Sequence, residues 1–271
     1  MAGTLYVVGT PIGNLGDLSP RALQTLRDVD FIAAEDTRVT LKLLNHFSIK
    51  KPLISYFEHN KLQRGDVICT RIESGENCAL VTDAGMPAIS DPGEDLVRQC
   101  AQRGIQAIVV PGPSAVVSAL ALSALPTGRF TFEGFLSMNK KNRREHLAQL
   151  KEETRTMVFY EAPHKLSHTL ADLYQTFGDR RLSIVRELTK VHEQVIRTTL
   201  KDAVQRYAQD PLKGELVLII EGKPQERPQP CPFDQALLLA QEYTQQGMST
   251  SEAAKTAAKF TGLKKGDLTK H

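Results

Sequence analysis

The sequence contains no tryptophan, and aromatic residues make up only 6% of its 271 residues. Its four cysteines, Cys69, Cys78, Cys100 and Cys231, show no C-x-x-C spacing, so they provide neither a zinc pattern nor a disulfide framework. No apolar run approaches the roughly 20 residues of a membrane span, and the N-terminus leads straight into a strand-like segment without a signal segment. We therefore expect a soluble, cytoplasmic protein with no metal site.

Phosphate-binding signatures are missing as well. The pattern G-x-x-x-x-G-K-[ST] does not occur, and Gly9, Gly13 and Gly16 do not fit G-x-G-x-x-G. A nucleotide pyrophosphate is therefore not the predicted ligand.

The chain also has little excess charge, with a formal net charge of +3, which alone does not indicate a nucleic-acid partner. The positive residues are nevertheless clustered. One cluster comprises Lys140, Lys141, Arg143 and Arg144, and a second comprises Lys255, Lys259, Lys264, Lys265 and Lys270. Each cluster is either a solvated helix face or a contact for an anionic partner.

Three loops rich in proline and glycine are the most informative feature present. They cover residues 9–17, 83–93 and 111–115, and each follows an apolar, strand-like run. Loops at the carboxyl ends of buried strands are where open α/β sheets bind ligands. Gly85 would let backbone approach the ligand, and Asp83 would accept hydrogen bonds from it. We predict a nucleoside-containing ligand held by backbone; the alternative is that Asp91-Pro92-Gly93 is an ordinary surface turn.

Strand-like and helical patterns alternate along most of the chain, which predicts parallel sheets with crossover helices. Too few residues separate the strand-like runs 182–187 and 193–200 for a helix, so an antiparallel pair and a mixed second sheet are expected. The predicted organisation is an N-terminal α/β domain at 1–112, a C-terminal α/β domain at 113–222, a Pro-rich linker at 223–232 and a small helical tail at 233–271.

The tail has the pattern of short helices joined by turns. A helix is expected from 233 to 246, a capping box at Ser249-Thr250-Ser251-Glu252 opens a second, and a third begins near 263. Helices so arranged, with lysines exposed, suit nucleic-acid docking. The alternative is a helical hairpin that packs on the main body.

Short motifs follow one another in a fixed order from Thr4 to about Gly222. They are Gly9-Thr10-Pro11-Ile12-Gly13-Asn14-Leu15-Gly16-Asp17, Ala34-Glu35-Asp36-Thr37-Arg38, His59-Asn60, Asp83-Ala84-Gly85-Met86-Pro87, Ser90-Asp91-Pro92-Gly93, Pro111-Gly112-Pro113-Ser114-Ala115, Phe132-Glu133-Gly134-Phe135-Leu136, Phe159-Tyr160-Glu161, Arg186-Glu187-Leu188-Thr189-Lys190 and Lys213-Gly214-Glu215. In the residues and order of these motifs, the chain resembles the tetrapyrrole methylase superfamily. Within that superfamily it resembles the branch that acts on ribosomal RNA. It departs from the branch at Ser137, where proline is usual, and in a tail that ends early at His271.

The resemblance implies two α/β domains of the tetrapyrrole methylase type, with S-adenosylmethionine in the cleft between them, and a homodimer. It further implies 2′-O-methylation of a cytidine in 16S rRNA, by resemblance cytidine 1402 of the decoding centre, within the small ribosomal subunit.

Cofactor-binding residues follow from the loops and from the resemblance. Transfer of the methyl group removes the sulfonium charge, so apolar walls and backbone carbonyls suit the cofactor better than a tight anionic clamp. Residues of the right chemical type are Pro11, Ile12, Ala84, Gly85, Ile89 and Ala115. Asp83 would bond the ribose or amino end, and Phe159 and Tyr160 would wall the adenine, although Phe159 alone also suits a core position. The resemblance adds Ser114, Leu188, Gly214 and Glu215.

The acceptor implied by the resemblance is a ribose hydroxyl, a poor nucleophile that must be aligned and relieved of its proton. The candidate catalytic residues are His59, Glu187 and Arg38, and Glu35, Asp36 and Lys190 lie on the same loops. His59 is the natural base by its ordinary pKa, Arg38 would hold a phosphate, and Glu187 is either a base or a partner of Lys190. The predicted RNA-binding residues are Arg38, Lys140, Lys141, Arg143, Arg144, Lys264 and Lys265.

Two alternatives stay open at the level of sequence. One is a tetrapyrrole (precorrin) C-methyltransferase, whose first loop typically reads Gly-x-Gly-Pro-Gly-Asp rather than the Gly-Thr-Pro-Ile-Gly-Asn found at residue 9. The other is a non-catalytic RNA-binding assembly factor that uses the basic clusters.

Overall fold

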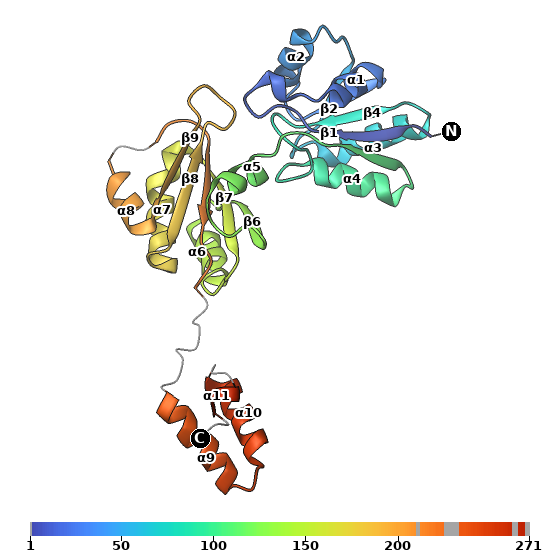
Figure 1. Cartoon of the computed structure of the whole chain (residues 1–271). Coiled ribbons are helices and arrows are strands. Elements are labelled where there is room, and N and C mark those ends of the chain that lie inside the picture. Colours follow the sequence, from blue (N-terminus) through green and yellow to red (C-terminus); the bar gives the residue numbers. More distant parts are fainter. Residues whose placement is uncertain (1, 210–211, 225–232, 262–264, 269–271) are drawn as a thin grey trace. The chain divides into compact units, whose positions relative to one another are not determined.

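The computed structural model describes residues 2–209, 212–224, 233–261 and 265–268. The chain divides into two compact units, Met1–Lys223 and Pro224–His271. The first unit contains two five-stranded sheets, and the second is helical (Figure 1). Most of the predicted Pro-rich linker, residues 225–232, lies outside the described residues, as does Cys231.

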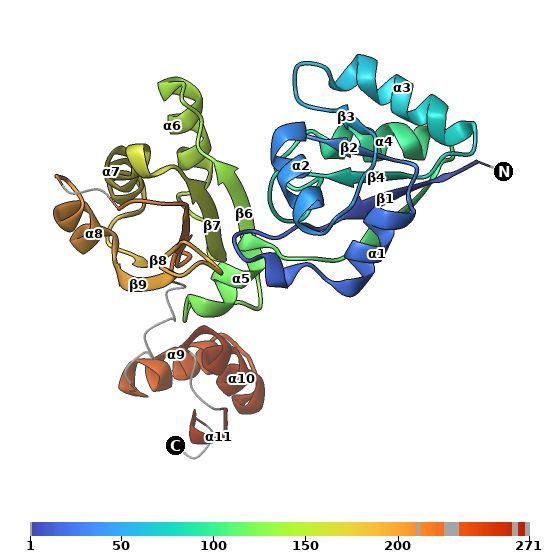
Figure 2. The same ribbon diagram turned by 90° about the horizontal axis from the view of Figure 1, so that it is seen from above.

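The first sheet is entirely parallel and has the strand order β3-β2-β4-β1-β5. Its elements are β1 (Thr4–Val8), η1 (Leu15–Asp17), α1 (Pro20–Asp28), β2 (Phe31–Ala34), α2 (Thr37–His46), β3 (Leu53–Ser55), α3 (Lys61–Glu73), β4 (Cys78–Val81), α4 (Gly93–Gln102) and β5 (Gln106–Val110). Helices α3 and α4 cover one face, and α1 and α2 cover the other (Figure 2).

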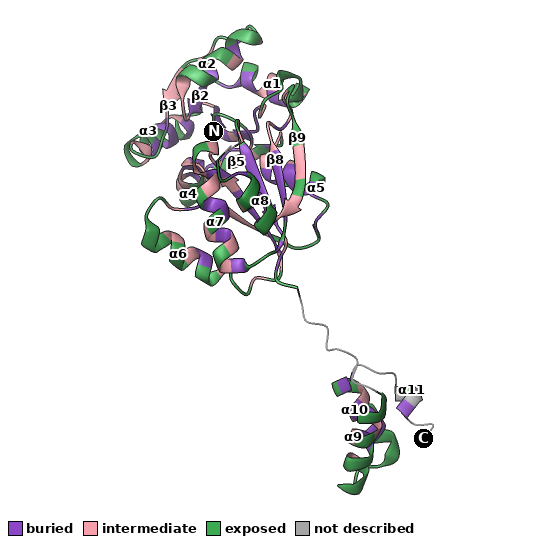
Figure 3. Cartoon of the chain, turned by 90° about the vertical axis from the view of Figure 1, so that its left-hand side faces the viewer, coloured by how far each residue is buried: buried purple, intermediate pink, exposed green. Residues whose placement is uncertain are grey.

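Alternation along the strands builds the two cores of this sheet. Leu5 and Leu80 point toward Ile68 of α3 and Leu96 of α4, whereas the next residue along, Val81, packs on the other face with α1 and α2. Because both faces are covered, the strands β2 and β4 are buried along their whole length, as expected for a parallel sheet. The edge strand β3 is only half-buried (Figure 3).

The second sheet is mixed and has the order β6-β7-β10-β8-β9. Its elements are α5 (Ala115–Leu122), β6 (Phe130–Phe135), α6 (Lys140–Gln149), β7 (Thr156–Glu161), η2 (Pro163–Lys165), α7 (Leu166–Phe177), β8 (Arg181–Arg186), β9 (Gln194–Thr199), α8 (Leu200–Arg206) and β10 (Leu216–Ile220). Strands β6 and β7 pair in parallel, β10 pairs antiparallel with β7 and β8, and β8 and β9 form the predicted antiparallel pair. Helices α6, α7 and α8 pack on one face, and α5 packs on the other.

The second unit consists of α9 (Phe233–Gln245), α10 (Thr250–Thr261) and α11 (Lys265–Leu268). Its small core is built mainly from alanines, with Ala236 and Ala240 of α9 against Ala254 and Ala257 of α10. The predicted cap is present, because the Ser249 hydroxyl lies 3.4 Å from the backbone N–H of Glu252 that donates to it. No helix in the described part of the chain has the length and apolarity to cross a membrane.

Candidate functional site

The three loops predicted to bind a ligand come together at the carboxyl ends of β4, β1 and β5, which are neighbours in the first sheet. Thr10 and Gly85 exchange two backbone hydrogen bonds of 2.9 and 3.1 Å. Gly9 and Gly112 pack backbone to backbone, since a Cβ on Gly9 would lie 2.6 Å from the Gly112 Cα. The three loops therefore form one rigid, interlocked surface on which bulkier residues would not fit.

The loop at 83–93 holds a conformation that most residues avoid. Gly85 has φ +90°, and the non-glycine residues Ala88 and Ser90 also have positive φ, at 66° and 68°. The Asp91 carboxylate stabilises this turn by accepting three backbone N–H groups of the same loop, those of Ala88, Ile89 and Gly93, at 2.8–3.2 Å. Strain of this kind persists only where the surroundings impose it, and it is concentrated at functional sites. Asp91 thus does form a turn, as the alternative interpretation held, but a strained one beside a cavity.

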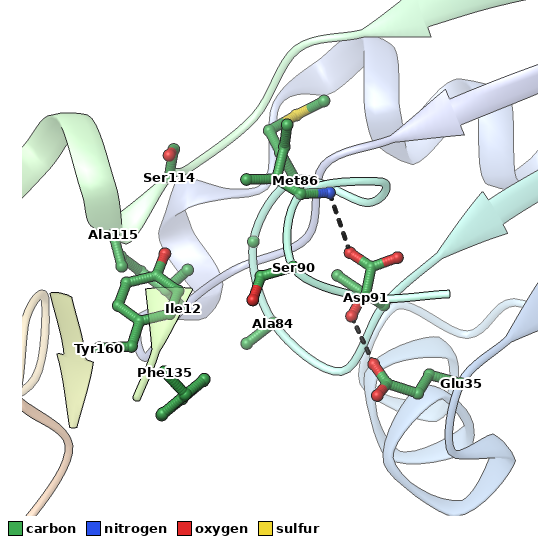
Figure 4. A pocket seen from close by; sticks show the side chains of 13 residues that line it. Ile12, Glu35, Ala84, Met86, Ser90, Asp91, Ser114, Ala115, Phe135 and Tyr160 are labelled. Atoms are coloured by element: carbon green, nitrogen blue, oxygen red, sulfur yellow. Dashed lines mark hydrogen bonds between the residues drawn. The ribbon is translucent and has the colours of Figure 1, made fainter. Parts of the chain in front are cut away.

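Beside these loops lies a cleft made of two adjoining hollows of about 440 and 140 Å³, a size suited to a small organic ligand. Both hollows share a set of lining residues, which are Ile12, Glu35, Thr82, Ala84, Ala115, Phe135 and Tyr160. Figure 4 shows Tyr160, Ile12, Ala115 and Phe135 on one side of this cleft and Glu35 on the other. The residues shared by both hollows are therefore apolar or aromatic toward the second sheet and acidic toward the loop after β2, while Glu161 and Glu215 of the second sheet line the larger hollow alone.

The acidic side contains carboxylates whose contacts fix their positions. The Thr82 hydroxyl donates to Glu35 Oε2 at 2.6 Å, and the backbone N–H of Asp36 donates to Asp83 Oδ1 at 3.0 Å. Partial burial raises the pKa of Asp83, and the nearby Glu35 and Asp36 carboxylates raise it further. Such a group favours a cationic ligand, because a neighbouring positive charge offsets both effects.

Most residues predicted to bind the cofactor line this cleft. They are Ile12, Asp83, Ala84, Gly85, Ile89, Ser114, Ala115, Tyr160, Leu188 and Glu215. Pro11, Phe159 and Gly214 do not line it. Phe159 is fully buried among α6, α7 and α8, because its neighbour Tyr160 occupies the cleft face of β7. The structure thus supports the alternative that Phe159 is a core residue, and at Gly214 a side chain would collide with Glu187.

The predicted catalytic residues are not brought together. Within residues 2–209, neither His59, Arg38 nor Glu187 lines either hollow. His59 is exposed in the loop after β3, which is the edge strand of the first sheet. Arg38 is 87% exposed and pairs with Asp36 at 2.6 Å.

Glu187 joins two loops of the second sheet. It accepts hydrogen bonds from the Glu215 N–H at 2.9 Å and from Lys190 Nζ at 3.1 Å. These two contacts, the backbone one first, lower the pKa of Glu187. A carboxylate with a lowered pKa is a weaker base, so the geometry favours the pairing role. Glu35, which lines both hollows, is better placed to act on a ligand.

The residues of the first basic cluster differ in exposure. Lys140, Lys141 and Arg144 are exposed on α6. Arg143 is only 12% exposed and donates to Asp172 at 2.5 Å and to Thr169 at 2.9 Å. It is therefore a packing residue of α6 and α7 rather than a free cation. Lys264 and the side chain of Lys265 lie outside the described residues.

Several lining residues were not singled out from the sequence, among them Phe135, Met86 and Glu161. All three lie inside the motifs on which the family resemblance rests. That resemblance was therefore the sequence signal that could have identified them as site residues. Glu161 is 5% exposed at the end of β7 and accepts a hydrogen bond from the Thr169 hydroxyl. Among the residues that the structure describes, no group of three His, Cys, Asp or Glu side chains is placed to hold a metal ion.

Comparison with known proteins agrees with this architecture. The family model described as Tetrapyrrole (Corrin/Porphyrin) Methylases matches residues 4–204. Solved structures with the same fold include a diphthine synthase, with a TM-score of 0.62 and 15% identity over 83% of this chain and 92% of that one. A uroporphyrin-III C-methyltransferase from Thermus thermophilus has a TM-score of 0.57 and 18% identity over 80% and 94%. At these identities the likeness shows the fold alone.

Curated relatives are much closer in sequence. A protein of Synechocystis named ribosomal RNA small subunit methyltransferase I is 46% identical over 98% of this chain and 96% of its own length. A protein of the same name from Thermotoga maritima is 48% identical over 82% of this chain and 99% of its own length. The chain therefore belongs to the tetrapyrrole methylase family, and within it to the group of relatives that carry this name.

Proposed function

We propose that the protein transfers a methyl group from S-adenosylmethionine to the ribose 2′-hydroxyl of a cytidine in 16S rRNA. The observation that carries the proposal is the cleft formed by the interlocked loops of β4, β1 and β5, in a chain 46% identical to a ribosomal RNA small subunit methyltransferase. The choice of the 2′-hydroxyl and of cytidine rests on the motif resemblance. The homodimer and the assembled small subunit as substrate stay predictions.

The residues of the cleft suit this cofactor. When bound, it would supply an electrophilic methyl group on a sulfonium centre. Ile12, Ala84 and Ala115 provide apolar walls, and Gly85 brings backbone close without a side chain. The carboxylates of Asp83 and Glu35 line the same space and suit the ribose hydroxyls or the ammonium end of the ligand rather than its sulfonium.

Methylation of a ribose hydroxyl has two requirements. The hydroxyl must be held in line with the methyl group, and its proton must leave. Within the described cleft, Glu35 is the carboxylate that borders both hollows, and its hydrogen bond from Thr82 fixes its orientation. We assign the proton-accepting role to the acidic side of the cleft rather than to His59.

The proposal is tested by methyl transfer from labelled S-adenosylmethionine to 16S rRNA, free and in 30S particles, followed by mapping of the modified nucleotide. A label on a ribose oxygen is expected. Transfer to a tetrapyrrole but not to rRNA would instead support the precorrin alternative. Binding of rRNA without cofactor binding would support the assembly-factor alternative.

A matched pair of glycine variants tests the site itself. Gly85→Val places a side chain 3.3 Å from Ile12 at φ +90°, whereas Gly104→Val introduces comparable strain at φ +68° with open space around it. S-Adenosylmethionine should raise the melting temperature of the parent and of Gly104→Val, as a ligand of the folded state does, but hardly that of Gly85→Val. Equal shifts in all three proteins would show that the cofactor binds elsewhere.

A further inference from the structure

Strand β6 contains a β-bulge that changes the direction of one aromatic side chain. Phe132 pairs with Val158 of β7, but Gly134 pairs with Phe159 and Phe135 pairs with Tyr160, so the register shifts by one residue at Glu133. In a regular strand, Phe132 and Phe135 would lie on opposite faces. The bulge places both on the face that Tyr160 occupies.

The result is a row of three rings along the cleft side of the second sheet. The Tyr160 ring centroid lies 4.9 Å from that of Phe132 and 5.4 Å from that of Phe135. Phe132 is packed into the core beneath α5. Phe135, in contrast, is 57% exposed and lines both hollows. Bulges are common beside active sites, where they redirect a side chain, and here the redirected side chain is an exposed phenyl ring.

The bulge is also tied to the basic helix α6. The extra residue, Glu133, contacts His146 of α6, with its Oε2 2.9 Å from Nε2. Between Phe135 and the helix lies Met138, which is 75% exposed. The helix itself opens with the exposed pair Lys140 and Lys141. An exposed ring at the cleft is thus followed in the chain by an exposed thioether and two cations.

We propose that Phe135 is a stacking surface for an unpaired nucleobase of the RNA substrate, and that the first turn of α6 holds the adjoining phosphates. An aromatic platform beside cations is how proteins bind single-stranded nucleic acid. The exposed Lys140 and Lys141 of α6 suit a polyanion, whereas the carboxylate of Glu35 in the cleft does not. This inference rests on the proposed function, because it takes rRNA as the substrate.

The adenine of the cofactor could stack on Phe135 in the same way as a base of the RNA. The experiment therefore measures binding of the cofactor and of RNA separately. The variants are Phe135→Ala, Phe135→Trp and the control Phe130→Ala, which removes a 37% exposed ring from the same strand before the bulge. Two dissociation constants are measured for each full-length protein, one for S-adenosylmethionine and one for a single-stranded 16S rRNA fragment containing the target cytidine. Thermal unfolding confirms that each variant is folded.

For Phe135→Ala we expect the Kd for RNA to rise about 10-fold, the usual effect of losing one stacked base, with the Kd for the cofactor unchanged. Phe135→Trp should bind RNA as well as the parent, and so should Phe130→Ala. A rise in the cofactor Kd alone would assign the ring to adenine and overturn the inference, as would no change in either constant. If the parent methylates no rRNA at all, the proposed function fails; if it does and Phe135→Ala binds RNA normally, only the stacking role fails.

Discussion

At the scale of single residues, the pKa values of Asp83, which lines the cleft, and of its neighbour Asp36 are shifted in opposite directions. Burial raises the pKa of Asp83, whereas the Arg38 side chain is the main cause that lowers the pKa of Asp36 to about 2. The folded state therefore binds the Asp83 proton more tightly than the unfolded state does, and an ionised Asp83 reduces stability as pH rises through its folded pKa. A cationic group of a ligand beside Asp83 would offset this cost.

We predict that Asp83→Asn raises the melting temperature at pH 7 only slightly, because solvent screens a charge this exposed, while it reduces the further rise caused by S-adenosylmethionine. The asparagine oxygen can still accept the Asp36 N–H, so the gain comes from removing the charge. The gain should disappear below pH 3.8, the ordinary value for an aspartate, where the parent carboxyl is protonated too. Melting curves between pH 3 and 8 measure both effects.

Asp36→Asn is the control with the opposite sign. In the parent, the lowered pKa of Asp36 stabilises the folded state above pH 3.8, and that stability is lost as pH falls toward about 2. The variant should therefore be slightly less stable than the parent at pH 7, and the difference should shrink in salt because Arg38 is exposed. A lower melting temperature for both variants would contradict the assignment of Asp83.

At the scale of elements, the charges in the first turn of α6 are unfavourable for its helix dipole. Lys140 and Lys141 occupy its first turn, where the partial positive charge of a helix disfavours cations. The Asn139 cap offsets this in part, by accepting the N–H groups of Lys141 and Asn142 at 2.9 and 3.2 Å, and Lys141 Nζ lies 3.9 Å from a carboxylate oxygen of Glu145. An anionic partner would make this arrangement favourable.

Replacing both lysines, Lys140→Glu and Lys141→Glu, should weaken RNA binding. It should stabilise the helix by about 0.3–1 kcal/mol at residue 140, whereas at residue 141 the loss of the pair with Glu145 offsets the gain. The dependence of RNA affinity on salt should become shallower by about one unit for each phosphate that the variant no longer neutralises. Urea unfolding and salt titrations measure the two effects. Lys42→Glu with Lys50→Glu, on α2 and the loop after it, makes the same change in net charge, and an equal loss of RNA affinity there would mean that only net charge matters.

Helices and strands were well predicted from sequence where the local pattern of apolar and polar residues determines them. The run 4–8 is β1, and the short interval after Arg186 does force β8 and β9 into an antiparallel pair. The bulge in β6 was not predicted, although Gly134 and the break in alternation at Phe135 are signals of a bulge. The face that Phe135 takes is set by the pairing of β6 with β7. The burial of Arg143 was missed for the same reason, since its partners Thr169 and Asp172 lie 26 and 29 residues away.

At the scale of the whole molecule, the site belongs to the first unit alone. Both sheets, the interlocked loops and the cleft lie within Met1–Lys223. The second unit has a core of its own, and α10 exposes Lys255 and Lys259 one turn apart. The relative from Thermotoga maritima is matched over 99% of its length by an alignment of 221 residues, about the length of the first unit. A protein of this group therefore exists without room for the helical tail.

We accordingly predict that a chain ending at Lys223 folds, keeps the melting-temperature shift caused by S-adenosylmethionine and methylates rRNA with an unchanged kcat. Its KM for rRNA should rise about 10-fold, since losing the two lysines of α10 removes one or two phosphate contacts. Lys255→Ala with Lys259→Ala in the full chain should reproduce much of that rise. If the truncated chain instead melts at a lower temperature or loses kcat, the tail is a packing element of the main body, which was the alternative open from sequence. If KM does not change, the lysines of α10 belong to a solvated face.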